Sequence, residues 1–401
     1  MKLVITGASG FLAGELIPFL RNNGHDLVLV SGRFGVLSEK YPDLVCVDYA
    51  DFDNHLVDAA CVLHLAVRHN DRQGDLSAFR EINVDLTLSV LEAAKSAGVK
   101  KFIFASSLHT LGLSPPRSDY ARSKAEAEEL VLNETGIDVS VLHMAAVHGS
   151  RFRGKLAVLN KCPKILLKPA LTCLGALRPT VHVEKVADRI EEILCNDRCG
   201  PHYLHDNLQD NPVFVWTKRT IDLLFALFVF VFLGWLMLLV WVAIKLDSPG
   251  PGFFIQERVG RNGKTFNCYK FRTMAQGTTQ AGTHEVSAAS ITKIGKILRS
   301  TKIDELPQIL NIARNEISLI GPRPCLPSQA ELVAKRRQLG VFDVKPGISG
   351  LAQIRDIDMS TPDRLVQVDA QYVALQCLSL DVKIALATAK GSGQGDKVVR
   401  D

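Results

Sequence analysis

A tyrosine and a lysine four residues apart are the first side chains whose types and spacing could do chemistry. Tyr120 and Lys124 stand in the segment Tyr-Ala-Arg-Ser-Lys, which opens an expected helix, and this spacing puts both on one helix face. A nearby ammonium lowers the pKa of a phenol, so the tyrosine could exchange a proton with a substrate hydroxyl or carbonyl near neutral pH. The pair Ser106-Ser107 follows an expected strand upstream. Together these residues predict a proton-transfer site.

The second candidate centre is an adjacent carboxylate pair, Asp304 and Glu305, between apolar neighbours and among many cations. A carboxylate can attack phosphorus to give an acyl phosphate, which divides one difficult transfer into two easier ones. Its neighbour could hold a magnesium ion that screens phosphate charge. The surrounding cations suit a pyrophosphate or anionic lipid headgroups, and they are Arg258, Arg261, Lys264, Lys270, Arg272, Lys293, Lys296, Arg299 and Lys302.

A glycine-rich turn must position a cofactor for the first centre. A short apolar strand over residues 3–5 leads into Thr-Gly-Ala-Ser-Gly-Phe-Leu-Ala-Gly and then into a helix over 15–20. Bare N–H groups and the helix dipole would face phosphates, and side-chain bulk is absent where the backbone must approach them. This context predicts a dinucleotide site built on Gly7, Ser9, Gly10, Phe11 and Leu12.

Three further strand ends are expected to complete this cofactor site. A strand over 26–31 ends before Arg33, which could pair with the 2′-phosphate of NADP and so favours NADPH over NAD. A strand over 44–47 ends at Asp48, placed to meet the adenine, and a strand over 61–65 runs into Ala66.

With these motifs in place, residues 1–205 resemble the extended short-chain dehydrogenases/reductases, in the group of nucleotide-sugar epimerases, dehydratases and reductases. The resemblance implies that Ser107 polarises the substrate oxygen, that Tyr120 is the acid/base and that Lys124 binds the nicotinamide ribose. It also implies that Asn83 and Ala66 line the cofactor, that Arg178 contacts the nucleotide, and that the chain forms a homodimer. The sequence of the stretch 142–149 differs from the motif usual in the family, so the resemblance does not identify the substrate.

An uncharged apolar run of 22 residues, Leu223 to Ile244, separates the two centres and fits the length of a membrane helix. Lys218-Arg219 precede it, and Arg258 and Arg261 follow, so both ends are expected on the cytoplasmic side. The nine cysteines include no Cys-x-x-Cys, which argues against a zinc site and favours a reducing compartment.

Residues 216–395 resemble the monotopic phosphoglycosyl transferases, a family of bacterial sugar transferases, through six motifs in the family's order. These include Gln256-Glu-Arg258-Val-Gly260, the segment 299–311 around Asp304-Glu305, Gly321-Pro-Arg323-Pro324 and Lys345-Pro-Gly-Ile-Ser-Gly350. The resemblance implies that Asp304 is the nucleophile and that Glu305 binds Mg²⁺. It also implies that five basic residues contact the phosphates or the uridine, namely Arg299, Lys270, Arg272, Arg323 and Arg355. The family's membrane helix is broken by Ser-Pro, whereas this chain has Gly234-Trp235 there, which leaves a spanning helix open as the alternative. Because the two catalytic halves flank the helix and NADPH and UDP-sugars are both cytosolic, we expect a re-entrant helix with Gly234 as its weakest point.

The expected fold is therefore an α/β Rossmann domain, a doubly wound parallel sheet, fused to a membrane-embedded, mostly helical α+β transferase domain. The expected boundaries are residues 1–205 for the cofactor domain, 206–216 for a linker, 217–247 for the re-entrant helix, 248–395 for the transferase domain and 396–401 for a tail.

The function expected from these two halves is bifunctional, in bacterial glycan and polysaccharide assembly such as that of O-antigen. The first half would reduce a UDP-4-keto-6-deoxy-N-acetylhexosamine with NADPH. The second would transfer the sugar-1-phosphate from the UDP-sugar to undecaprenyl phosphate and release UMP, with Mg²⁺. Two alternatives stay open for the first half: a UDP-N-acetylhexosamine 4-epimerase that retains NAD, and a non-catalytic cofactor-binding scaffold. Expected partners are UDP-sugar, polyprenyl phosphate and membrane lipids, with no nucleic acid, and both domains would face the cytoplasm at the inner membrane.

Overall fold

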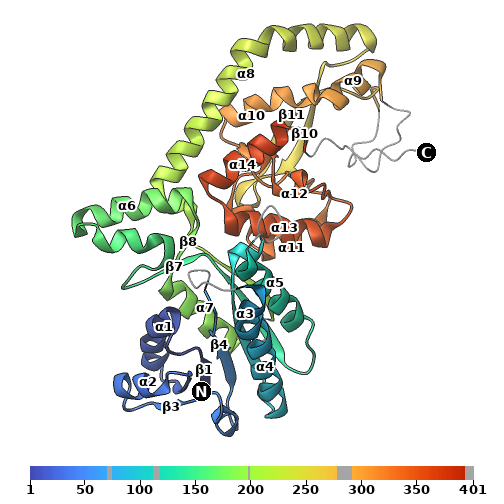
Figure 1. The fold of residues 1–401 in the computed structure, drawn as a ribbon. Helices are drawn as coiled ribbons and strands as arrows, with labels where there is room; N and C mark the ends of the chain where they lie inside the picture. Colours follow the sequence, from blue (N-terminus) through green and yellow to red (C-terminus); the bar gives the residue numbers. More distant parts are fainter. Residues whose placement is uncertain (70–74, 112–117, 197–198, 278–290, 393–401) are drawn as a thin grey trace. The chain divides into compact units, whose positions relative to one another are not determined.

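The computed structural model describes residues 1–69, 75–111, 118–196, 199–277 and 291–392. The chain divides into two compact units, the first comprising Met1–Leu171 with Pro179–Asp206 and the second Thr172–Arg178 with Asn207–Asp401. Each unit is described by itself (Figure 1). The expected tail, 396–401, lies outside the described residues.

Unit 1 is built on a parallel sheet of seven strands in the order β3-β2-β1-β4-β5-β6-β9. The strands alternate with helices along the chain, which is the connectivity that parallel strands require. The strands are β1 (Lys2–Thr6), β2 (Asp26–Val30), β3 (Val45–Val47), β4 (Cys61–His64), β5 (Lys101–Ser107), β6 (Asp138–Met144) and β9 (Gly200–Leu204), and β7 (Ala146–His148) pairs separately with β8 (Thr180–His182). The order reverses between β1 and β4, which is where doubly wound sheets bind ligands.

Helices pack on the sheet and bury its apolar strands (Figure 1). They are α1 (Phe11–Asn22), α2 (Phe34–Lys40), α3 (Leu76–Arg80), α4 (Leu86–Ser96), α5 (Asp119–Leu132) and α7 (Val183–Cys195), whereas α6 (Lys164–Leu177) is mostly exposed and its last turns belong to unit 2. Val4, Val62, Phe102 and Val141, one from each of four neighbouring strands, lie in one core with α4 and α5 residues. The predicted Rossmann-like parallel sheet is confirmed.

Unit 2 begins with one long helix, α8 (Pro212–Asp247), which starts earlier than the expected residue 217. The side chain of Asn211 caps it by accepting a hydrogen bond from the Phe214 N–H at 3.0 Å, and Pro212 takes the first position, where a missing N–H costs nothing. The helix is long and apolar enough to cross a membrane, and only 11% of its most apolar stretch is buried. A core helix would be mostly buried, so the exposure of this apolar surface is consistent with membrane association.

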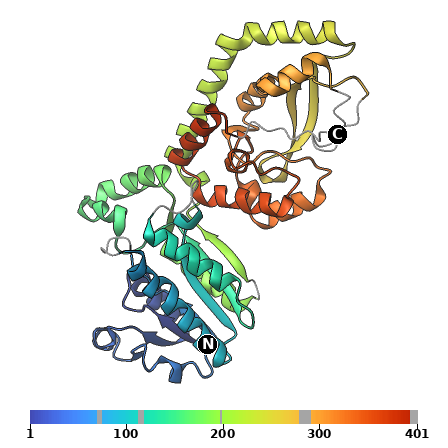
Figure 2. The same ribbon diagram turned by 45° about the vertical axis from the view of Figure 1, so that its right-hand side comes forward.

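Figures 1 and 2 show that α8 bends near its middle instead of running straight. Its first half packs through Ala226 and Val229 against Ile309 and Ile312, and its second half packs through Val240 and Ile244 against Phe271 and Leu298. The Trp235 Nε1–H donates to the Phe232 carbonyl at 2.9 Å beside Gly234. Both halves of α8 thus rest on the same domain.

The rest of unit 2 is a small, mixed domain of short elements. An antiparallel hairpin pairs β10 (Phe253–Val259) with β11 (Thr265–Phe271), and β12 (Ser318–Ile320) pairs in parallel with β13 (Gly347–Ser349). The helices are α9 (Lys293–Thr301), the 3₁₀ turn η8 (Ile303–Gln308), α10 (Ile309–Ala313), α11 (Ala330–Gln338), α12 (Leu351–Ile354), α13 (Pro362–Leu375) and α14 (Leu378–Ala389).

Candidate functional site

The glycine turn brings the ends of β1 and β4 into close approach. Gly7 has φ +70°, and a Cβ built there would lie 2.5 Å from the Ala66 nitrogen, so only glycine fits. Gly10 caps α1, and the first turn of α1 holds no acidic side chain that would neutralise the positive end of the helix dipole. This cradle has the form that a dinucleotide pyrophosphate requires. Phe11 and Leu12 form the first turn of α1.

The ends of β2 and β3 lie beside the same turn. Ser31 Oγ donates to Ser9 Oγ at 2.8 Å and accepts from the Arg33 N–H at 3.1 Å, so the two loops are tied together. Arg33 is exposed, and Asp48 accepts from the Ala50 N–H at 3.3 Å. The sequence missed one contact here: the Gly7 N–H donates to the Tyr49 hydroxyl at 3.0 Å.

Ser107, Tyr120 and Lys124 come together at the end of β5 and the start of α5. Burial raises the pKa of Tyr120, and a hydrogen bond with Ser107 opposes that rise. Lys124 is buried, donates to the Ala105 carbonyl at 2.7 Å and lies 4.3 Å from the centre of the Phe104 ring. Burial lowers its pKa to about 7. With a pKa of about 7, Lys124 is about half protonated at neutral pH, and its ammonium group donates to the Ala105 carbonyl. The lowering of the phenol's pKa by Lys124 stays a prediction.

Asn83 is fully buried in a π-helical turn, Glu81–Asp85, and bridges two segments. Its Oδ1 accepts from the Arg68 N–H at 2.8 Å, and its Nδ2 donates to Ser123 Oγ at 2.9 Å. The side chain thus fixes the loop after β4 against the helix that carries Tyr120.

A half-buried carboxylate behind these residues, Glu128, was not foreseen. Its Oε2 accepts from Ser106 Oγ at 2.8 Å, and its Oε1 lies 2.6 Å from His143 Nε2. Burial acts to raise the pKa of Glu128, but His143 together with the hydrogen bonds from Ser106 and Thr110 holds that pKa below its usual value. His143 belongs to the stretch 142–149, whose sequence differs from the motif usual in the family. This difference was the signal in the sequence that pointed to His143 and its partner Glu128.

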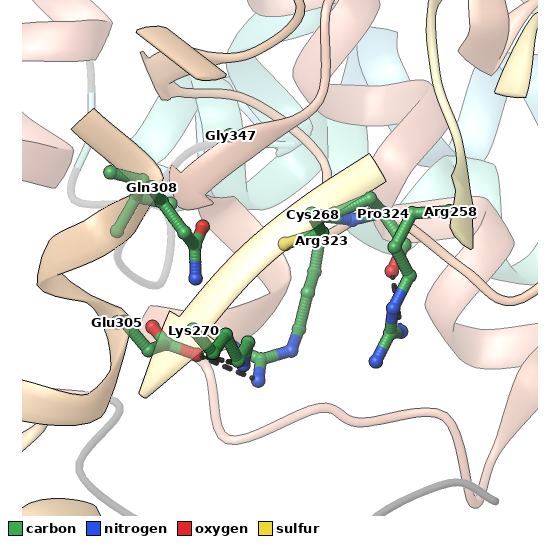
Figure 3. A pocket seen from close by; sticks show the side chains of 9 residues that line it. Arg258, Cys268, Lys270, Glu305, Gln308, Arg323, Pro324 and Gly347 are labelled. Carbon is green, nitrogen blue, oxygen red and sulfur yellow. Dashed lines mark hydrogen bonds and ion pairs between the residues drawn. The ribbon is translucent and has the colours of Figure 1, made fainter. Parts of the chain in front are cut away.

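The carboxylate pair of unit 2 lies in η8, immediately after α9. Lys302 adopts a left-handed conformation, φ +56°, which ends α9 and turns the chain into η8. Asp304 is 8% exposed. Glu305 accepts from Lys270 Nζ at 2.6 Å and from Arg323 Nη2 at 3.3 Å (Figure 3). Burial acts to raise the pKa of Glu305, but Lys270 and Arg323 outweigh it and lower that pKa to about 2.

A hollow beside Glu305 carries an excess of positive charge. Arg258, Lys270 and Arg323 line it together with Glu305, Cys268, Gln308, Pro324, Gly347 and Ile348 (Figure 3). Three cations face one carboxylate, which suits an anionic group such as a diphosphate. The sequence placed Arg258 in the cation cluster that suits a pyrophosphate, but not among the five contacts that the family resemblance implies. The strand pattern offered a further signal. Arg258 and Phe254 lie on the same face of β10, and Phe254 is paired with Lys270 of β11.

A second hollow, mostly apolar, meets the first at Glu305 and Ile348. Phe225 and Val229 of α8 line it, with Leu306 and Ile309 of the small domain. Lys302, Ser349, Gln353, Thr388 and Ser392 add polar groups, and the Gln353 Oε1 is buried with no hydrogen-bond partner in the described chain. One carboxylate therefore separates a cationic space from a space that the apolar helix lines. Asp304 is not among the described residues that line either hollow.

The cationic hollow is not lined by the other arginines expected to bind substrate, which are Arg272, Arg299, Arg355 and Arg178. Arg272 is buried and donates to the carbonyls of Ser248 and Pro249 at 2.7 Å, so it stabilises the end of α8. Arg299 Nε donates to Thr273 Oγ1 at 3.1 Å, and its Nη1 is buried with no hydrogen-bond partner in the described chain. Arg355 Nη1 donates to Gln371 Oε1 at 3.0 Å, and Arg178 is exposed after α6.

A buried ion pair supports Arg323 from behind. Arg336 donates through Nη2 and Nε to one oxygen of Asp369, at 2.6 and 3.1 Å, and both side chains are 2% exposed. Arg336 Nη1 also donates to the Arg323 carbonyl at 2.8 Å. The pair therefore fixes the backbone of a residue that touches Glu305.

Comparison with known families assigns both halves. Residues 3–205 match the NAD dependent epimerase/dehydratase family, and residues 213–394 match the bacterial sugar transferase family. The chain is a fusion of these two families.

Relatives of the transferase domain come from several bacteria. The UDP-N-acetylgalactosamine-undecaprenyl-phosphate N-acetylgalactosaminephosphotransferase of Aeromonas hydrophila is 33% identical over 54% of this chain and 53% of its own length. The uncharacterized sugar transferase EpsL of Bacillus subtilis is 36% identical over 43% of this chain and 85% of its own length. The undecaprenyl-phosphate glucose phosphotransferase of Komagataeibacter xylinus is 37% identical over 48% of this chain and 39% of its own length. The chain thus spans about half or less of the first and third of these relatives.

The epimerase/dehydratase domain also aligns with solved structures. The dTDP-glucose 4,6-dehydratase DesIV from Streptomyces venezuelae aligns at 22% identity over 51% of this chain and 74% of its own, with a TM-score of 0.42.

The transferase domain contains no cluster of three or more metal-ligand side chains among the described residues. Magnesium usually takes only one or two protein carboxylates and completes its shell with water and substrate phosphates. Asp304 and Glu305 fit that pattern, although Lys270 and Arg323 already compensate the charge of Glu305.

Proposed function

We propose that this fusion makes a UDP-sugar in its first domain and transfers the sugar-1-phosphate to undecaprenyl phosphate in its second. The position of Glu305 between a cationic hollow and an apolar one carries the proposal. The cationic hollow would take the diphosphate of the UDP-sugar. The apolar hollow would take the phosphate end of a lipid acceptor, whose chain would enter along α8. Relatives of the transferase domain are named as undecaprenyl-phosphate sugar phosphotransferases, which supports this substrate class.

In the proposed transfer, a carboxylate oxygen of Asp304 attacks the sugar-bearing phosphorus of the UDP-sugar. The bond between this phosphorus and the oxygen that bridges to UMP breaks, UMP leaves, and an acyl phosphate forms on Asp304. An oxygen of undecaprenyl phosphate then attacks the same phosphorus and frees the Asp304 carboxylate. Glu305 is the weaker nucleophile of the two because Lys270 and Arg323 withdraw its charge, which is consistent with its pKa of about 2. A Mg²⁺ ion held by Glu305 would screen the phosphate charge.

In the proposed reduction, Tyr120 gives a proton to the C4 oxygen of a UDP-4-keto-6-deoxy-N-acetylhexosamine, and Ser107 donates a hydrogen bond to that oxygen. NADPH, when bound, supplies the hydride. The cradle at Gly7, where a Cβ would meet Ala66, fits the cofactor's pyrophosphate, and Ser9, Gly10, Phe11, Leu12, Arg33 and Asp48 would complete its site. Lys124 would hold the ribose and Arg178 the nucleotide of the sugar substrate.

The helix α8 would enter the bilayer and return to the same face. Its bend and the packing of both halves on one domain support a re-entrant path (Figure 2). Arg219 Nη1 donates to the Ile312 carbonyl at 2.6 Å before the apolar run, and Arg272 Nη2 donates to the Ser248 carbonyl at 2.7 Å after it. One domain thus binds both ends of the run. Both catalytic domains would then face the cytoplasm, where UDP-sugars and NADPH are found.

The test is UMP release by the purified full chain with undecaprenyl phosphate, Mg²⁺ and UDP-4-keto-6-deoxy-N-acetylglucosamine, with and without NADPH. We expect UMP only with NADPH, and none from the variants Asp304→Asn and Tyr120→Phe. The Tyr120→Phe variant should still release UMP from the reduced UDP-sugar, which makes it the matched control. UMP in equal amounts without NADPH would contradict the reductase assignment. Release by Asp304→Asn at the wild-type rate would contradict the covalent mechanism.

A further inference from the structure

The segment 151–178 concentrates positive charge, and all of its cations except Arg178 lie outside the residues assigned to either candidate site. It contains seven lysines and arginines and no aspartate or glutamate, so its charge exceeds the net +5 of the entire chain. A solvated surface on a protein of balanced composition mixes both signs. A segment whose charges are all positive instead indicates an anionic partner.

Apolar side chains stand among these cations in full contact with solvent. Ile165 is 85% exposed, and Leu166 and Val158 are 53% and 65% exposed. Lys161, Lys164 and Lys168 are exposed as well; Lys164 and Lys168 flank Ile165 within α6, and Lys161 ends the 3₁₀ turn that precedes it. Single exposed apolar residues are ordinary. Exposed apolar side chains whose charged neighbours in the segment are all cations are typical of segments that lie in a membrane interface.

The end of this segment belongs to the compact unit that carries α8. Unit 2 includes Thr172–Arg178, which is the C-terminal part of α6 and the residue after it. The Asn211 side chain, which caps α8, donates to the Thr172 carbonyl at 2.8 Å, and Ser379 Oγ donates to the Leu177 carbonyl at 2.8 Å. The helix α6 therefore ends against the first turn of the apolar helix. Trp216, one turn into α8, is 73% exposed, as an aromatic at a membrane interface would be.

We propose that Lys161, Lys164 and Lys168, with Ile165 and Leu166, dock this segment onto the headgroups of anionic lipids. We call these five residues the α6 patch. The inference rests on α8 being in the bilayer, and it does not depend on the chemistry proposed for either site. The occupant is a lipid surface because the same chain already carries a membrane helix next to α6, and because the patch offers apolar side chains that a free phosphate or nucleotide would not need.

The docking strength follows from the three lysines. Each cation near an anionic surface favours docking by a factor of about five, so three together favour it about a hundredfold. This attraction weakens as the screening length falls from about 10 Å at 0.1 M salt to about 3 Å at 1 M salt. Docking should therefore depend on both lipid charge and salt.

The experiment measures how fast a cysteine at position 165 reacts with a membrane-impermeant maleimide. The full chain carries Ile165→Cys and is placed in nanodiscs of phosphatidylcholine alone or mixed with phosphatidylglycerol. A matched control carries Val36→Cys, at an apolar position of α2 that is 63% exposed. In both proteins, serine replaces the native cysteines that are exposed or lie next to the patch, Cys162, Cys173, Cys195 and Cys199.

We expect labelling at position 165 to be at least tenfold slower in the anionic nanodiscs, with no such difference at position 36. Reversing the three lysines with K161E, K164E and K168E should abolish the difference. Adding 1 M KCl to the protein with its native lysines should abolish it as well, without any charge-reversing substitution. Equal rates at position 165 in both lipids would overturn the proposal. The proposal would also be overturned if neither charge reversal nor salt changed the protection of position 165 from labelling. It would likewise be overturned if that protection required UDP and did not depend on lipid charge. None of these results depends on turnover at either site, so they remain distinct from failure of the proposed function.

Discussion

The buried pair Arg336–Asp369 should separate the stability of the transferase domain from its activity. Removing one member of a buried pair leaves the other charge without a partner, which costs about 3–5 kcal/mol. We therefore expect Asp369→Asn to destabilise the domain by that amount. For a unit of this size each kcal/mol lowers Tm by about 2–4 °C, so the midpoint should fall by about 6–20 °C.

The double variant R336M/D369L should give a different result. Replacing both charges by apolar side chains of similar volume is often neutral, so we expect Tm to return to within a few degrees of the wild type. Activity should not return, because the Arg323 carbonyl loses the donor that lies 2.8 Å away and Arg323 then holds Glu305 less well. We expect UMP release to stay at least tenfold lower than in the wild type.

The assay is thermal unfolding of the detergent-purified protein, followed by maleimide dye binding to its buried cysteines, beside UMP release. The matched control is Lys335→Met on the same helix. Lys335 pairs with Glu331 and Asp363 at the surface, and such pairs contribute about 0–1 kcal/mol. The reasoning is refuted if Asp369→Asn and Lys335→Met shift Tm equally. It is also refuted if the double variant regains full activity together with full stability.

Three further predictions test the two sites. In Gly7→Ala the new Cβ would lie 2.5 Å from the Ala66 nitrogen, so NADPH affinity measured by fluorescence should fall at least about a hundredfold, while UMP release from a finished UDP-sugar should persist. Because burial lowers the pKa of Lys124 to about 7, this residue is mostly neutral at pH 8. If the cofactor ribose favours the ammonium form of Lys124, cofactor binding at pH 8 should take up a proton, and calorimetry in two buffers would detect this uptake. The K124M variant should lose the proton uptake. In Lys270→Met, burial should raise the pKa of Glu305 from about 2, so the acid limb of UMP release should move to higher pH and the rate should fall about a hundredfold; an unmoved limb would contradict the assignment.

The first domain was predictable from sequence because its signals are local. Apolar runs of strand length alternate with helical segments, and the glycines stand where the backbone of β1 meets that of β4. The state of Lys124 was not predictable, because it depends on burial against Phe104 and on the Ala105 carbonyl, which are contacts across the sheet. Spacing along α5 placed Tyr120 and Lys124 on one face but could not say where the ammonium points.

In the second domain the five expected phosphate contacts divide into two groups. Lys270 and Arg323 form ion pairs with Glu305 beside the cationic hollow, and their contact with phosphate stays a prediction. Arg272 instead binds the end of α8, because a helix that ends beside Ser248 and Pro249 leaves carbonyls that need donors. Nothing in the local sequence distinguishes an arginine that binds a helix end from one that binds phosphate. The apolar hollow was also missed, because it forms only where α8 meets η8 and β13.

The bend of α8 has a mechanical consequence for the membrane. Laid out straight, its apolar run of 22 residues would extend about 33 Å, roughly the full hydrocarbon thickness. On the re-entrant path proposed for α8, the helix would reach only about half that depth and would add cross-sectional area to one leaflet alone. Such a wedge would favour convex curvature and relieve packing stress among lipids with small headgroups. On the same proposal, the transferase domain would draw its acceptor from a single leaflet, so its output would follow how fast spent carrier is returned to that side.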